Sequence, residues 1–157
     1  MPLLPSGDEA GFAAEQLIER SKMLRIALTG WMAACDALVL NAYEFLGDFH
    51  FRRLKGARAV WPERAAVPGV PALIRQRVPG FADDAAVTAQ LGTIQTAMDV
   101  LINYIETNVQ ASLVVAGGWI AILSVVNDQF VPRTITSGAA LAALKAQLQL
   151  LRNELSA

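Results

Sequence analysis

Apolar positions repeat at alternating intervals of three and four residues over most of the chain, a spacing typical of one face of a helix. It predicts a first long helix over residues 6–53, which Gly30 and Gly47 could bend or break. Its apolar face holds two adjacent stripes and therefore needs more than one neighbouring helix to cover it. The main stripe consists of Leu17, Leu24, Leu28, Trp31, Cys35, Leu38, Ala42, Phe45 and Phe49.

Two later segments carry a cleaner repeat of 3.5 residues, which predicts coiled-coil-like seams. The helix predicted over 83–110 begins at Asp83 and Asp84, whose carboxylates suit the positive end of a helix dipole. Its seam is Val87, Leu91, Ile94, Met98, Leu101 and Ile105. The helix predicted over 137–156 has the seam Leu141, Leu144, Leu148, Leu151 and Leu155. The spacing leaves open whether these seams pair within one chain or between chains.

Proline punctuates the segment between the first two helices. Pro62, Pro68, Pro71 and Pro79 predict an ordered connector over 54–82 with a short helix near 71–77, because closely spaced prolines oppose a long helix. With the helices on either side, this connector belongs to a single domain spanning residues 1–157.

The segment 111–136 is the least decided part of the pattern. Residues 111–126 carry no charge, and β-branched side chains are dense around the turn-forming pair Asn127 and Asp128. We expect a short β-hairpin near 119–135, with a continuous buried helix over 109–126 as the alternative. A membrane span there is disfavoured, because basic flanking residues are missing. The predicted fold class is mostly α: an elongated helical bundle with coiled-coil-like seams and this hairpin.

Composition favours self-association. The 157-residue chain is 54% hydrophobic and 17% charged, and a domain of this size leaves much of its surface uncovered. We therefore predict a homo-oligomer whose copies cover each other's apolar surface, the alternative being a compact Ala-rich monomer. The net charge of −1 gives no reason to expect a nucleic-acid partner.

No arrangement of residues predicts catalysis. The single cysteine, Cys35, and the single histidine, His50, cannot form a His/Cys metal cluster within one chain. A phosphate-binding loop and a nucleophile elbow are both missing from the sequence. The first ten residues lack the pattern of a signal peptide, so assembly in a cytoplasm is expected. We predict a protein that is not an enzyme and uses no cofactor or small-molecule substrate.

Basic residues are concentrated in one part of the chain. Seven of the thirteen lie between residues 52 and 77, where Glu63 is the one acidic residue. This asymmetry favours an interface with an acidic partner surface, and a solvated basic segment is the alternative. The candidate interface residues, which include the apolar hairpin, are Arg52, Arg53, Lys55, Arg58, Arg75, Arg77, Trp119, Ile120, Ile122 and Phe130.

Three phrases resemble a family of small tailed-bacteriophage and prophage proteins. They are "RAAVPGVPALIRQ" at 64–76, "AMDVLINYIETNV" at 97–109 and "VPRTITSGAALAALKAQLQLL" at 131–151. The resemblance covers roughly residues 57–157. It departs from the family's pattern at Trp119, where a tyrosine is usual, and at Ile135, where an aromatic residue is usual.

The resemblance implies a non-enzymatic structural component of a tailed phage virion, in the tail, tail tip or fibre apparatus. Such a protein is assembled in the host cytoplasm and acts by packing against sibling copies and other virion proteins; a homotrimer is expected by analogy with tail fibres. Two alternatives are a cytoplasmic helical adaptor that binds an acidic partner, and a membrane-associated phage protein that uses residues 109–126.

Overall fold

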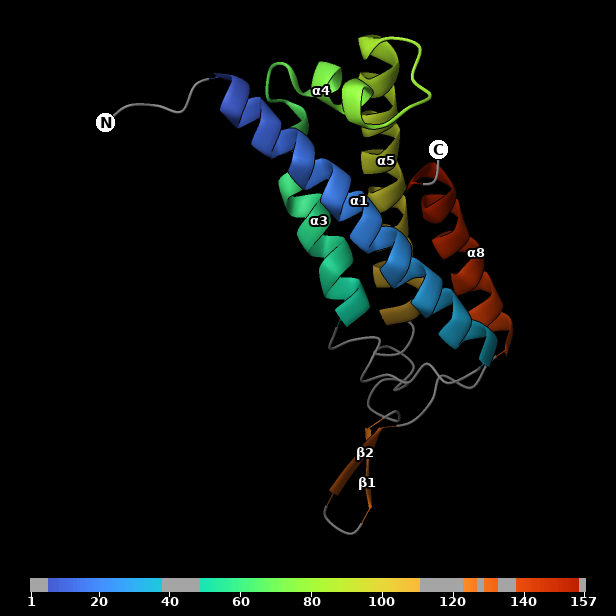
Figure 1. The fold of residues 1–157 in the computed structure, drawn as a ribbon. Helices are drawn as coiled ribbons and strands as arrows, with labels where there is room; N and C mark the ends of the chain where they lie inside the picture. The colour runs from blue at the N-terminus through green and yellow to red at the C-terminus, as the bar shows by residue number, and fades with distance from the viewer. Residues whose placement is uncertain (1–5, 38–48, 111–122, 127–128, 133–137, 156–157) are drawn as a thin grey trace.

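The computed structural model describes residues 6–37, 49–110, 123–126, 129–132 and 138–155, and Figure 1 shows their arrangement. Most of these residues are helical, which confirms the prediction of a mostly α fold. The α-helices are α1 (Ser6–Ala37), α3 (Phe49–Ala65), α4 (Val70–Arg77), α5 (Asp84–Tyr104) and α8 (Gly138–Leu155). A π-helix, η1 (Ile105–Gln110), continues α5.

The four longer helices form a closed ring. α1 packs against α3 and α8, and α5 packs against the same two helices on the other side. Successive helices of the ring run in opposite directions, and the short α4 lies across one end, in contact with α1 and α5 (Figure 1). This is the up-down-up-down arrangement of a four-helix bundle.

All the predicted seam residues of the second and last helices lie in the core of a single chain. Val87, Leu91, Ile94, Met98, Leu101 and Ile105 are buried in the same cluster as the five seam leucines of α8, Leu141 to Leu155. Leu17, Leu24, Leu28, Trp31 and Cys35 of α1 complete that cluster. The pairing that the spacing left open is therefore made within the chain.

The predicted boundary between helix and connector is wrong at residue 54. Residues 54–65 are helical and belong to α3, which includes Pro62 near its end. Trp61 explains why the helix persists: its side chain is fully buried, and its indole N–H donates a hydrogen bond to the Leu91 carbonyl at 2.9 Å. The free energy gained by burying the Trp61 ring offsets the cost of the backbone hydrogen bond that the proline removes.

The predicted long helix 6–53 is two helices, α1 and α3, with residues 38–48 outside the described part of the chain. The short helix predicted near 71–77 is α4. The start of α5 also agrees with the sequence, because the Asp83 carboxylate accepts a hydrogen bond from the Ala86 amide at 2.8 Å. Such a side-chain cap satisfies one of the free N–H groups at a helix start.

Two short strands occur in the segment that the sequence left undecided. β1 (Leu123–Val126) pairs antiparallel with β2 (Gln129–Pro132), with Val126 opposite Gln129. The other residues of the expected hairpin, 119–122 and 133–135, lie outside the described ranges, as does the turn pair. Among the helices that the structure describes, none combines the length and the hydropathy needed to cross a membrane.

Candidate interaction surface

A groove of about 400 Å³ lies between α1 and α3, beside the first residues of the predicted basic segment 52–77. Its α1 wall consists of Arg20, Met23 and Leu24, and its α3 wall of Arg52, Arg53, Gly56 and Ala57. Each wall has the spacing of neighbouring turns on one helix face. Leu24 and Ala57 are buried and form the floor, while Gly56 adds no side chain, which helps keep the groove open.

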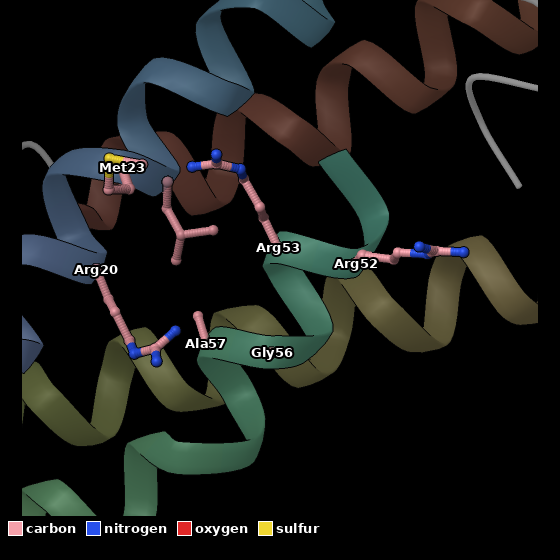
Figure 2. Close-up of a pocket in the computed structure, with 7 residues that line it drawn as sticks. Arg20, Met23, Arg52, Arg53, Gly56 and Ala57 are labelled. Carbon is pink, nitrogen blue, oxygen red and sulfur yellow. The ribbon is translucent and has the colours of Figure 1, made fainter. Parts of the chain in front are cut away.

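The arginines give this groove its chemical character. Figure 2 shows Arg20 reaching from α1 toward Ala57 and Arg53 reaching from α3 toward Met23, whereas Arg52 points away from the groove. Arg53 has a contact within the protein. The Nε atom of Arg20 is buried and has no hydrogen-bond partner among the described residues. A buried donor without a partner is costly, and an incoming acceptor such as a carboxylate would relieve that cost.

The structure disperses the basic cluster that the sequence predicted. Three of its members form ion pairs with acidic residues of α5 or η1, and their charges are therefore balanced within the chain. Arg58 binds the Asp99 carboxylate through Nε and Nη2. Lys55 lies 3.5 Å from Glu106, and Arg75 lies 3.2 Å from Asp84. In contrast, neither Arg20 nor Arg52 forms a salt bridge within the described part of the chain.

Arg77 lies elsewhere, on the wall of a second hollow of about 230 Å³ between α1, α4, α5 and α8. Core side chains such as Ile94 and Leu155 line this hollow, and Lys22 and Arg25 join Arg77 among its polar lining. The predicted interface residues are therefore divided between at least two places and do not form one continuous patch.

The apolar half of the predicted interface is largely outside the described residues. Trp119, Ile120 and Ile122 belong to the range 111–122, which the structure does not describe. Phe130 lies in β2, where it stands opposite Val125 of β1.

The outward face of α1 is a second candidate surface, which the sequence analysis did not predict. Large hydrophobic side chains that remain exposed include Phe12 (54%), Met23 (42%) and Ile26 (71%), all on this helix. Gly30 and Ala33 are also exposed, one and two turns beyond Ile26. The intervals between these five positions are 11, 3, 4 and 3 residues, which puts them on one helix face. The repeat was visible in the sequence, but the stronger repeat of the core stripe obscured it.

The described residues hold no group of three His, Cys, Asp or Glu side chains that could bind a metal ion. Cys35 is buried at the end of α1, and burial, with a smaller contribution from the neighbouring Asp36 carboxylate, raises the pKa of its thiol to about 11. A thiol with such a pKa stays protonated and is a poor nucleophile at neutral pH.

Comparison with known proteins adds no name to this architecture. No family model matches the chain, and neither a curated protein nor a solved structure shows significant similarity to it. The fold thus defines the class, a mostly α helical bundle, and the function must be argued from its surfaces.

Proposed function

We propose that this protein is a non-enzymatic structural component of a tailed phage virion, in the tail, tail tip or fibre apparatus. It acts by packing its surfaces against sibling copies and neighbouring virion proteins. The virion part of this proposal rests on the resemblance of residues 57–157 to small phage and prophage proteins.

The packing part is supported by one observation above all, the exposed apolar face of α1. The bundle buries its own seams, yet Phe12, Met23 and Ile26 remain open to solvent on a single helix. Single exposed hydrophobic residues are ordinary, but several on one helix face are typical of an interaction surface.

The ends of the bundle add to this picture. α1 ends, α3 begins, η1 ends and α8 begins at the same end of the molecule (Figure 1). The sequence that joins these ends includes the uncharged run 111–126.

Mass spectrometry of purified virus particles tests the proposal. We expect peptides of this chain in particles at a constant ratio to a known tail protein, after washing in high salt. Particles that contain none of it, from cells that express it, would contradict the proposal.

A helical adaptor that binds an acidic partner is the second candidate, and the arginines of the α1–α3 groove favour it. The two candidates differ in location, because an adaptor would stay in the lysate and copurify with a host protein. The charge of the groove does not separate them, since a virion neighbour could also be acidic.

A further inference from the structure

We propose that the outward face of α1 binds a second copy of this chain, with the two α1 helices parallel and Glu15 of each copy beside Arg20 of the next. The inference rests on the proposed function as a self-associating building block, and it specifies the surface and orientation of that association. Three features of α1 support this contact: the spacing of its outward residues, the elements that border its two flanks, and the charged residues on those flanks.

The outward face of α1 has the pattern of a coiled-coil seam. Its positions alternate in steps of four and three from residue 12 to residue 33: Phe12, Gln16, Glu19, Met23, Ile26, Gly30 and Ala33. None of these seven residues is part of the buried core. Phe12, Glu19, Met23, Ile26, Gly30 and Ala33 are all exposed. In Figure 1 α1 lies in front of the other helices, and no other described element passes over it.

The second half of the seam suits close contact between helices. Met23 and Ile26 provide large apolar side chains, while Gly30 and Ala33 are small enough to let another backbone approach. Burying exposed apolar surface of this kind is the main driving force of association. Gln16 and Glu19 are polar seam positions, which in coiled coils restrict register and partner choice at some cost in stability.

The two flanks of this face differ in charge: one carries Glu15 and, one heptad later, Lys22, and the other carries Arg20. On one side Glu15 lies three heptads before Asp36, whose carboxylate accepts hydrogen bonds from Lys145 at 2.6 and 2.7 Å, so this flank borders α8. Glu15 and Glu19 are both exposed, and their like charges four residues apart repel each other. On the other side, Arg20 lines the groove against α3 and has the unpartnered Nε atom.

The two possible orientations differ in the partner that they offer to Arg20. In a parallel pair of helices, a flanking residue contacts the residue five positions later on the partner, which places Glu15 beside Arg20. In an antiparallel pair each flank meets its own copy, so that the arginine grooves of the two copies would face each other. Like charges held together in this way oppose association, and the parallel pair also carries one such cost, because the Glu19 side chains of the two copies meet at the seam. The parallel arrangement offers a carboxylate to the Arg20 guanidinium, whose Nε atom has no hydrogen-bond partner among the described residues. Hydrogen bonds between such charged groups are the strongest that side chains form.

The same contact can close into a ring of two or three copies, because Glu15 and Arg20 lie on opposite flanks of the same helix face. A contact between different surfaces closes by rotation about an axis along the helices. The threefold arrangement expected by analogy is therefore compatible with this interface.

The test measures the mass of the purified full chain in solution by size-exclusion chromatography with light scattering over a range of concentrations. We expect Ile26→Asp to raise the dissociation constant at least about tenfold, because it puts a charge in the centre of the apolar contact. Glu15→Arg and Arg20→Glu should each weaken association by a similar factor. The double variant Glu15→Arg/Arg20→Glu should recover most of the wild-type association, since the pair is restored with its charges exchanged.

Leu150→Asp is the matched control, because Leu150 is 56% exposed on α8, away from the α1 face. It should leave association unchanged. Helical circular dichroism of every variant establishes that it is folded; Ile26 and Glu15 are exposed, so their variants keep the test decisive if Arg20→Glu does not fold.

If none of the three single substitutions changes the dissociation constant, this interface is wrong and the copies associate through another surface. A double variant as weak as the single ones would overturn the parallel orientation. A wild-type monomer at micromolar concentration would overturn both interface and self-association, whereas presence of the chain in virus particles is decided separately by mass spectrometry.

Discussion

At the residue scale, Trp61 shows how a single side chain can reverse a local signal. Pro62 lacks an amide hydrogen and disfavours helical geometry at the residue before it, which is Trp61 itself. Even so, α3 runs on to Ala65, because the Trp61 ring is fully buried and its N–H is hydrogen-bonded to Leu91. Burying an aromatic ring contributes a few kcal/mol, about the size of the proline's cost.

Cys35 gives a prediction at the same scale. Its thiol has a pKa of about 11 in the folded protein, against 9.0 for an unperturbed thiol. Below pH 9 both states keep the proton, and stability does not depend on this group. Between pH 9 and 11 the unfolded chain loses the proton while the folded chain keeps it, so the free energy of unfolding falls.

We expect urea denaturation to show this loss as about 1 kcal/mol between pH 8 and pH 10. The variant Cys35→Ala, measured under the same conditions, should lack that part of the pH dependence. If the two proteins lose stability in parallel, the Cys35 thiol is not shielded as the structure indicates.

At the element scale, the periodicity of α3 explains why the basic cluster in the sequence is not a patch on the surface. Lys55 and Arg58 lie three residues apart and face Glu106 and Asp99 on the α5 side. Arg53 instead reaches into the groove against α1, whereas Arg52 stands at its edge and points away from it (Figure 2). Exposed ion pairs such as these contribute little to stability, but they decide which charges remain free for a partner.

Neighbouring residues of α5 allow a matched test of its seam. Leu101 is buried in the bundle core, whereas Val100, the residue before it, is 51% exposed. Leu101→Asp should lower the free energy of unfolding by several kcal/mol, because it leaves a charge in an apolar core without a partner. Thermal denaturation followed by circular dichroism should show a large drop in the midpoint. Val100→Asp should change it little, and equal effects would contradict the assigned seam.

At the scale of the whole molecule, the apolar seams of the helices pack against one another within one chain. The oligomer predicted from composition is therefore not needed to cover the leucine seams of α5 and α8. The self-association that we propose therefore rests on the outward face of α1. The proposed oligomer is therefore an assembly of copies that each fold on their own, rather than an intertwined coiled coil.

Dilution tests this view. We expect the helical circular dichroism signal per residue to stay constant over the concentration range in which light scattering shows the oligomer dissociating. The reason is that each copy keeps its own core when separated. A helical signal that falls together with the mass would mean that folding and association are coupled, contrary to the closed bundle.

The sequence alone determined the elements that depend on regular spacing. The 3.5-residue seams of α5 and α8, the cap at Asp83 and the short helix at 71–77 all arise from local periodicity and local hydrogen bonding, which are written in adjacent residues. Only the tertiary structure decided that α3 passes through Pro62, that Lys55, Arg58 and Arg75 are neutralised, and that Arg20 joins the groove. Each of these depends on contacts between residues far apart in the chain, such as Trp61 with Leu91 and Arg58 with Asp99, and spacing within one segment carries no information about them.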